Sequence, residues 1–256
     1  MIDREQRLGV LIPDGKHILR PVLDELNRRG FHSSSQRRNG HLLVEVEDPD
    51  VVFIAQSSRD ITRLVDEGIY PLGIVASDRR AEYLALASLH ENDPSPNLEE
   101  LAVLEVFNPN VRLSVLVRNN YRYQIVTDLE HQRVITSYPG LTMQFFEQHF
   151  PKYDGVPINL DGRTNGKEEV QVSDHRAEAA VVIVDSGKTM RTWSLRELAV
   201  VKDNIQPVLI GNTNFLQSRG SESLFEQFEQ FMDRFQNGER SDISLPSTPT
   251  LLPTLV

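Results

Sequence analysis

The residues with the clearest chemical potential lie where an apolar segment meets a polar loop. Residues 179–184 are all apolar, and the five residues that follow are Asp185, Ser186, Gly187, Lys188 and Thr189. A glycine at this place lets the main chain approach a ligand closely, and successive N–H groups at a strand–helix turn can bind an anion. The hydroxyls, the lysine charge and the Asp185 carboxylate add contacts that suit a phosphorylated ribose. We therefore predict a sugar-phosphate site at this loop.

The same five residues also fit a plainer interpretation. A strand–turn–helix joint with Ser or Thr capping the helix needs no ligand, and the motif alone does not separate the two possibilities. A P-loop is excluded, because the first glycine of that pattern is missing: Ile183 and Val182 stand four and five residues before Gly187.

The amino-acid composition and net charge exclude several kinds of binding site. The 256 residues include no cysteine, which excludes disulfides, thiolate nucleophiles and cysteine-bound metals. A net charge of −10 disfavours a broad nucleic-acid surface, although a few local donors can still hold a small phosphorylated ligand. The histidines show no metal-site spacing, and neither an apolar leader nor a membrane-spanning run is present. We expect a cytoplasmic protein that binds neither nucleic acid nor membrane and has no metal ligands of its own.

Short β-branched runs alternate with amphipathic helical patterns, which is typical of an α/β fold. Strands are expected at 8–12, 41–46, 51–55, 72–75, 111–118, 133–136, 179–184 and 207–210. Helices are expected at 18–29, 58–68, 141–149 and 221–235, and another should begin near Thr189 and carry Leu195 and Leu198. The Pro-, Ser- and Thr-rich residues 238–256 are expected to form a flexible tail.

The loop resembles the phosphoribosyl-diphosphate loop of the ATP phosphoribosyltransferase family. That pattern places a Glu at Glu169 and Ser/Thr-Gly-any-Thr at Ser186 to Thr189, and both are present here. Three positions differ: His175 replaces a glycine, Ala180 an Ile or Val, and Val182 an aspartate. The loss at Val182 removes a carboxylate beside the ribose site unless Asp185 substitutes for it.

Further segments match the family in the correct order over residues 8–215. They are Gly15-Lys16, where the family has Gly-Arg, then Gln36-Arg37, Arg59-Asp60-Ile61, Leu72-Gly73-Ile74 with Asp78, Arg112-Leu113-Ser114 and Arg133 to Pro139. The resemblance implies two α/β lobes similar to type II periplasmic binding proteins, with the ligand cleft between them. The first lobe would comprise 1–107 plus 200–220 and the second 108–199, followed by the helix 221–237 and the tail 238–256.

The resemblance also implies a reaction. N1 of ATP would be joined to ribose 5-phosphate from phosphoribosyl diphosphate, with Mg²⁺ assisting and pyrophosphate leaving, as the first step of histidine biosynthesis. The loop from Asp185 to Thr189 would hold phosphoribosyl diphosphate. The expected ATP-binding residues are Lys16, Arg37, Arg59, Tyr138 and Glu169, while no catalytic residue is assigned.

Two alternatives stay open: a related phosphoribosyltransferase with another acceptor, and a non-catalytic binding or regulatory relative. A homo-oligomer is expected, and the short form of the family, which works with a separate regulatory subunit, is the closer analogue.

Overall fold

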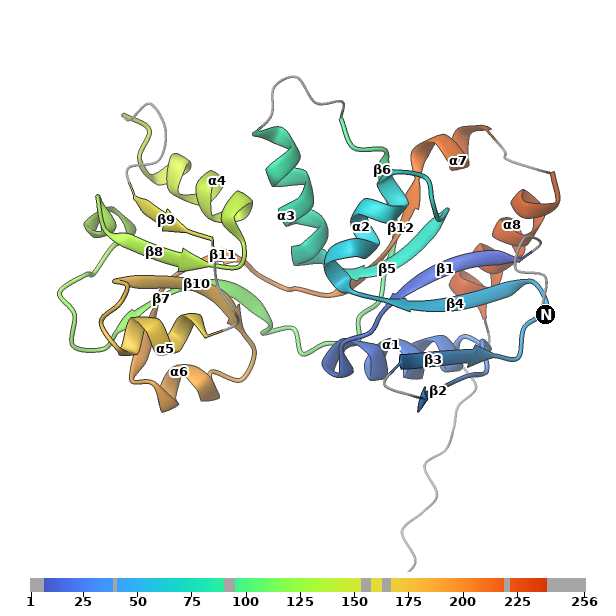
Figure 1. Cartoon of the computed structure of the whole chain (residues 1–256), viewed down its shortest axis with the longest axis horizontal. Coiled ribbons are helices and arrows are strands. Elements are labelled where there is room, and N and C mark those ends of the chain that lie inside the picture. Colours follow the sequence, from blue (N-terminus) through green and yellow to red (C-terminus); the bar gives the residue numbers. More distant parts are fainter. Residues whose placement is uncertain are drawn as a thin grey trace, which may run out of the picture.

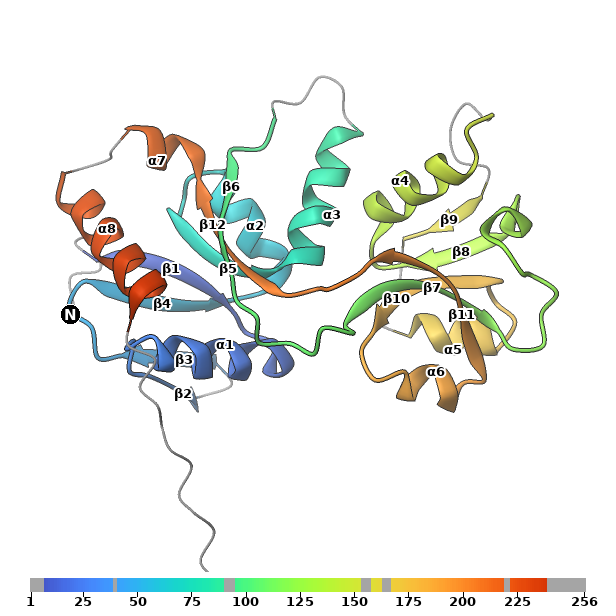
Figure 2. The same cartoon turned by 180° about the vertical axis from the view of Figure 1, so that it is seen from behind.

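The computed structural model describes residues 7–38, 41–89, 95–152, 158–162, 167–218 and 222–238. The predicted flexible tail lies outside these residues except for Gly238. Two lobes lie side by side, and two extended segments cross from one to the other (Figures 1 and 2). This confirms the predicted α/β fold with two lobes.

The first lobe is built on a five-stranded sheet in the order β4-β1-β5-β12-β6. Its strands are β1 (Leu8–Pro13), β4 (Val51–Gln56), β5 (Leu72–Ala76), β6 (Leu98–Val103) and β12 (Pro207–Asn212). β1 runs parallel to β4 and β5, whereas β12 is antiparallel to β5 and β6. Because β1, β4 and β5 are parallel, their carboxyl ends share one edge, which is the usual place for a ligand in such sheets.

Helices cover both faces of this sheet. They are α1 (Lys16–Arg28), α2 (Ser58–Asp66), α3 (Ser77–Ser88), α7 (Thr213–Ser218) and α8 (Glu222–Asn237), and a hairpin of β2 (Ser33–Arg38) and β3 (His41–Val46) lies beside α1. Val10 and Ile12 of β1 pack with the apolar stripes of α1 and α8, while Leu11 packs against α2 on the other face. Such burial of both faces is expected of a central parallel strand.

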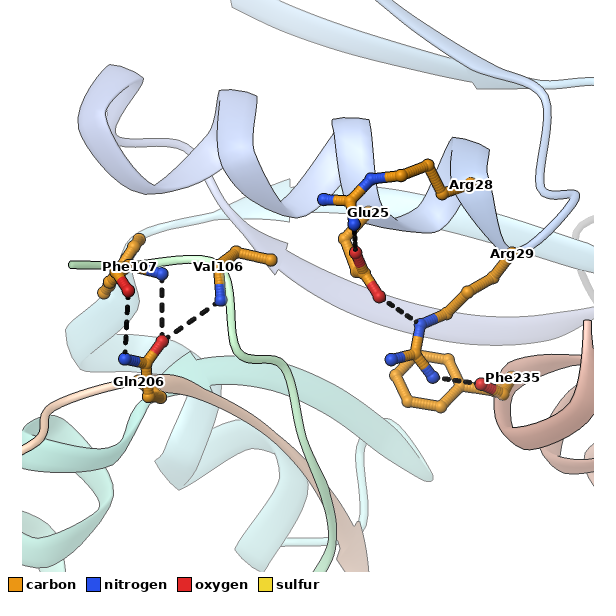
Figure 3. A network of polar contacts seen from close by, with 7 residues as sticks. All are labelled: Glu25, Arg28, Arg29, Val106, Phe107, Gln206 and Phe235. Atoms are coloured by element: carbon orange, nitrogen blue, oxygen red, sulfur yellow. Dashed lines mark hydrogen bonds and ion pairs between the residues drawn. The ribbon is translucent and has the colours of Figure 1, made fainter. Parts of the chain in front are cut away.

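Contacts of the Arg29 side chain link α8 to the end of α1. Its guanidinium binds the Glu25 carboxylate at 2.7 Å, donates to the Phe235 carbonyl and lies 4.5 Å from the centroid of the Phe235 ring (Figure 3). Phe231 and Phe235 are buried against Phe31 and the first-lobe core. The phenylalanine stripe of α8 therefore serves, at least in these two residues, as core.

The second lobe holds another five-stranded sheet, in the order β11-β7-β10-β8-β9. Its strands are β7 (Arg112–Arg118), β8 (Arg133–Thr136), β9 (Asn159–Asp161), β10 (Ala179–Val184) and β11 (Leu195–Lys202). Its helices are α4 (Pro139–His149), α5 (Glu168–Ser173), α6 (Lys188–Thr192) and the 3-10 turn η2 (Val126–Leu129). Phe146 of α4 packs on one face of β10, and Val172 of α5 packs on the other.

The prediction of a helix through Leu195 and Leu198 is wrong. Helix α6 ends at Thr192, Ser194 turns the chain with a φ of 53°, and Leu195–Lys202 pairs as β11 with β7. Leu195 is buried in the apolar cluster on the α5 face of the sheet. Two leucines three residues apart fit a helix, but a strand can bury them equally well when β-branched residues follow.

The two crossing segments, 104–111 and 203–206, are tied together where they pass between the lobes. The Gln206 side chain accepts hydrogen bonds from the N–H groups of Val106 and Phe107 at 3.1 and 2.9 Å (Figure 3). Ser77 N–H donates to the Gln206 carbonyl at 2.8 Å, which fixes the start of α3 at the same place. Within the described parts of the chain, no helix is both long and apolar enough to cross a membrane.

Candidate active site

The loop after β10 has the main-chain geometry that a close approach to a ligand requires. Gly187 has a φ of +66°, in the left-handed region that favours glycine, and α6 begins at the next residue. Asp185, Ser186 and Lys188 are exposed. Among hydrogen bonds between described residues, no main-chain N–H from Ser186 to Thr189 acts as a donor. These amides are available to an anion.

A depression of about 250 Å³ surrounds this loop. It is lined by all five predicted loop residues together with Leu116, Glu169, Ile183, Val184 and Met190. Glu169 is half-buried on α5, and this burial raises the pKa of its carboxyl, with repulsion from Glu168 acting in the same direction. Glu169, which the sequence analysis expected to bind ATP, thus lies at the loop and does not line the cleft between the lobes.

A larger cleft of about 520 Å³ opens between the lobes. Both lobes line it, with residues His17, Ile18, Ser57, Ser58, Arg59, Ala76, Asp78, Arg79, Phe107, Val111, Tyr138, Ile183, Asp185 and Ile205. Ile183 and Asp185 also line the depression at the loop, so the two spaces adjoin. Apolar walls with a few converging polar groups are the usual form of a small-molecule site.

Tyr138 lies where the two lobes contact each other. Its hydroxyl donates to Asp78 Oδ2 at 2.5 Å, and the Arg79 guanidinium carbon lies 4.1 Å from the centroid of its ring. Arg79 also donates to the Ser137 carbonyl at 3.3 Å. Burial, followed by the charge of Asp78, raises the pKa of the Tyr138 hydroxyl, which therefore stays protonated. Tyr138 lines the cleft, and its hydroxyl is directed to α3.

The other predicted ATP-binding residues are divided among three places. Arg59 is exposed near the start of α2 and lines the cleft, where the Ser57 hydroxyl accepts from its N–H. Lys16, the first residue of α1, lines a separate depression with Gln36 and does not line the cleft. Arg37 lies in β2, and its side chain is outside the described part of the structure.

Sequence analysis did not assign Asp78, Arg79, Ser58 or His17 to the site. Asp78 and Arg79 follow directly after β5, at the edge where the parallel strands β1, β4 and β5 end. Polar residues at that position are a general signal for a ligand site, and this signal was available in the sequence.

Mg²⁺ usually keeps several waters and is held by substrate phosphates with one or two carboxylates. Within the described residues, no group of three or more His, Asp or Glu side chains could form a cage. Asp185 and Glu169 both line the depression at the loop. Two carboxylates at the loop are the kind of protein donors that such a phosphate-bound ion uses.

The position of His175 shows how one departure from the family pattern is accommodated. His175 ends the turn after α5 with a φ of 61°, a left-handed conformation in which glycine is preferred. Its N–H donates to the Val172 carbonyl at 3.2 Å. The fold therefore keeps the turn at this position and accepts a strained histidine there.

Comparison with known proteins was made by sequence and by structure. The family described as "HisG: ATP phosphoribosyltransferase" matches residues 57–237. An ATP phosphoribosyltransferase of Methanosarcina barkeri is 23% identical over 212 residues, which are 83% of this chain and 66% of that protein. One of Methanopyrus kandleri is 26% identical over 189 residues, which are 74% of this chain and 60% of that protein. The chain thus spans less than two thirds of the length of these relatives.

The solved structures that share the fold include an enzyme complex and a periplasmic binding protein. The ATP phosphoribosyl transferase (HisG:HisZ) complex from Thermotoga maritima superposes with a TM-score of 0.64 at 17% identity, covering 90% of this chain and 96% of that one. The periplasmic aliphatic sulphonate binding protein SsuA from Escherichia coli gives a TM-score of 0.52 at 12% identity, covering 90% of this chain and 72% of that one. The likeness to both confirms the predicted architecture, two lobes similar to periplasmic binding proteins.

Proposed function

This chain belongs to the ATP phosphoribosyltransferase (HisG) family, and from that premise we propose that it catalyses transfer of a phosphoribosyl group to ATP. N1 of the adenine forms a bond to C1 of the ribose, and the bond from C1 to pyrophosphate breaks. This is the first step of histidine biosynthesis, and we propose a cytoplasmic location, where its substrates ATP and phosphoribosyl diphosphate are found. The observation that best supports this proposal is the loop after β10. Its main-chain amides make no hydrogen bonds to other described residues, and the loop adjoins the cleft between the lobes.

The loop would bind the 5-phosphate. The N–H groups after Asp185, the hydroxyls of Ser186 and Thr189, and the Lys188 charge would supply donors to this anion. Asp185 lines both spaces, so its carboxylate is placed to accept from ribose hydroxyls while the phosphate remains at the loop. Holding the sugar at two points would orient C1 toward the cleft.

The cleft would bind ATP. Tyr138 would border the adenine, and Arg59 would pair with the phosphate chain from the start of α2. Lys16 and Arg37 would extend this phosphate contact along α1 and β2, outside the cleft itself. Glu169 would contribute a polar group at the rim of the loop. Because charge develops on both ribose and pyrophosphate in the transition state, fixed charges and dipoles would supply most of the catalysis.

Phosphoribosyl diphosphate would bring in Mg²⁺, which would neutralise the leaving pyrophosphate, and the Asp185 carboxylate, which lines the loop depression, would be available to hold the ion. We further propose a homo-oligomer and a separate regulatory subunit as partners. The Thermotoga maritima relative was solved as a HisG:HisZ complex, which supports a two-component assembly.

A different acceptor for the same phosphoribosyl group is the second candidate. Val182 occupies the position of a family aspartate and is buried in an apolar cluster with Leu116 and Val172, so no carboxylate enters the ribose site from there. The loss of this carboxylate means that the chain differs from the family pattern beside the ribose, and this difference favours a change of acceptor.

Release of pyrophosphate from phosphoribosyl diphosphate and Mg²⁺ tests the proposal directly. Release that requires ATP supports it, whereas release only with another nucleotide or base supports the second candidate. Calorimetric titration with phosphoribosyl diphosphate and Mg²⁺, on the wild type and on Gly187→Trp, tests the loop. Binding without any pyrophosphate release would reveal a non-catalytic relative, and equal binding by the two proteins would remove the loop from the site.

A further inference from the structure

Helices α3 and α4 join the two lobes at a place apart from the crossing segments. The two helices, one from each lobe, face each other on one side of the crossings (Figures 1 and 2). Glu82 of α3 is 6% exposed, and its two carboxylate oxygens accept the N–H groups of Gly140 and Leu141, each at 2.8 Å. N–H groups in the first turn of a helix have no acceptor within that helix, so a carboxylate of the first lobe caps a helix of the second.

The main chains of the two helices approach so closely that position 140 has room only for glycine. A Cβ added to Gly140 would lie 2.9 Å from the Leu86 nitrogen and 3.0 Å from the Ala85 Cβ. Because packed interiors have little free space, a side chain at position 140 would force α3 and α4 apart. Farther along the two helices, Gln144 Nε2 donates to Ser88 Oγ at 3.1 Å.

The other end of this contact reaches the cleft. The Tyr138 hydroxyl donates to Asp78 Oδ2 at 2.5 Å, and Arg79 donates to the Ser137 carbonyl at 3.3 Å. Asp78 and Tyr138 are both buried, and both line the cleft. The contact between α3 and α4 therefore begins at the cleft wall and continues outward along both helices, with all its hydrogen bonds running from one lobe to the other.

The other side of the cleft lacks such a link. Among the described residues, no hydrogen bond or ion pair joins α1 or α2 to α6 or to the loop after β10. There His17 and Arg59 of the first lobe and Asp185 of the second lobe line the cleft. Domains joined only by chain segments usually move relative to each other, and a second attachment away from those segments restricts that motion.

We propose that the contact between α3 and α4 holds the two lobes in the orientation that forms the cleft before any ligand binds, with Gly140 and Glu82 as positioning residues. A ligand that contacts both lobes then binds without a prior change in their orientation. Its affinity is not reduced by a population of molecules in which the cleft is not formed. The inference concerns the lobes themselves, and only its test with ligands rests on the proposed function.

Distances between labels on the two lobes test the inference without a known ligand. Because the chain has no cysteine, two introduced cysteines carry spin labels at chosen positions only. Asp24→Cys on α1 and Asp174→Cys at the end of α5 are exposed positions in different lobes, and neither lines the cleft or the loop depression. Pulsed electron paramagnetic resonance should give one narrow distance distribution, unchanged by phosphoribosyl diphosphate, Mg²⁺ and ATP. A shift of the main distance on addition of these ligands would overturn the inference.

Two variants in the labelled protein test the contact itself. Gly140→Ala should push α3 away from α4, so the distance distribution should broaden or shift. Gly162→Ala is the matched control, because a Cβ added there lies at an ordinary 3.7 Å from the nearest atoms, those of Pro139. Glu82→Ala removes the capping carboxylate without adding an atom, and it serves if Gly140→Ala does not fold. Distributions like that of the wild type in these two variants would show that the contact does not hold the lobes.

A comparison of two ligands separates lobe orientation from general loss of structure. Residues of the second lobe alone line the loop depression, whereas both lobes line the cleft. By calorimetry, Gly140→Ala should bind ATP about tenfold more weakly, as expected if a tenth of the molecules keep the cleft formed, and should bind ribose 5-phosphate as the wild type does. Equal weakening of both ligands would show a damaged second lobe and overturn the positioning role. If the wild type binds neither ligand, the proposed function fails, and the label distances still decide the inference.

Discussion

The side-chain amide of Gln206 pairs in both directions with the main chain of Phe107: Phe107 N–H donates to Oε1 at 2.9 Å, and Nε2 donates to the Phe107 carbonyl at 3.2 Å. The two residues belong to the two segments that cross between the lobes (Figure 3). Both crossings pass this one point, so the pair holds the two segments together at the edge of the first lobe.

Gln206→Ala should lower the free energy of unfolding by about 1–3 kcal/mol. The change leaves the N–H groups of Val106 and Phe107 and the Phe107 carbonyl without their side-chain partner. Urea unfolding measures the loss, with Gln236→Ala on the exposed side of α8 as the control. Equal midpoints for the two variants would show that the pair does not stabilise the connection.

Gly187→Ala should weaken binding of phosphoribosyl diphosphate about tenfold. A φ of +66° costs an L-residue about 1–2 kcal/mol, so the loop would relax away from the geometry that presents its amides. Gly68→Ala is the matched control, because Gly68 has a φ of +71° and does not line the cleft or the loop depression. Gly68→Ala should lose stability and keep the affinity of the wild type. If Gly187→Ala likewise loses stability but keeps its affinity for phosphoribosyl diphosphate, Gly187 is needed only to avoid strain and not to bind the ligand.

How far the sequence predicts this structure depends on how local each signal is. Strand β10 and its loop were predicted with the observed bounds, because an unbroken apolar run followed by Asp-Ser-Gly-Lys is specified within a dozen residues. Strand β11 was predicted as helix because its leucine spacing fits both structures, and only pairing with β7, far away in sequence, decides between them.

The site follows the same rule. The loop residues are neighbours in sequence and line one depression, which Glu169 also lines, whereas the pairing of Tyr138 with Asp78 joins residues 60 positions apart. No local pattern indicates that the Tyr138 hydroxyl faces α3, so this pairing becomes visible only when the two lobes are packed together.

His175→Gly should stabilise the protein by up to about 1 kcal/mol. Its φ of 61° is strained for histidine and free of strain for glycine, although glycine also gains entropy in the unfolded chain, which reduces the benefit. Thermal unfolding measures the change. His149→Gly, in the last turn of α4, should instead destabilise. A loss of stability at both positions would show that the contact of His175 with the Tyr121 ring outweighs the strain.

Val182→Asp should destabilise the second lobe by several kcal/mol and should not improve binding of phosphoribosyl diphosphate. Val182 is 6% exposed within an apolar cluster, where a carboxylate would have no partner. Val200→Asp, at a site 40% exposed, is the control and should change stability little. Urea unfolding and calorimetry test both statements, and tighter binding by Val182→Asp would show that the family carboxylate can be restored.

Glu82 joins the lobes through the start of α4, and its titration should make stability depend on pH. Its carboxylate oxygens accept the N–H groups of Gly140 and Leu141, each at 2.8 Å. Burial raises the pKa of Glu82 despite these bonds, so the folded protein binds this proton more tightly than the unfolded chain does. The stabilisation is therefore complete below the unfolded pKa of about 4.3 and is lost as pH rises through the folded value.

Glu82→Gln removes this titration. The difference in unfolding free energy, wild type minus Glu82→Gln, should fall as pH rises from about 4 to about 7. Urea unfolding at a series of pH values measures the difference. A difference that rises with pH would mean that the bonds to α4 outweigh burial and that the seam between the lobes is held by the charged form of Glu82.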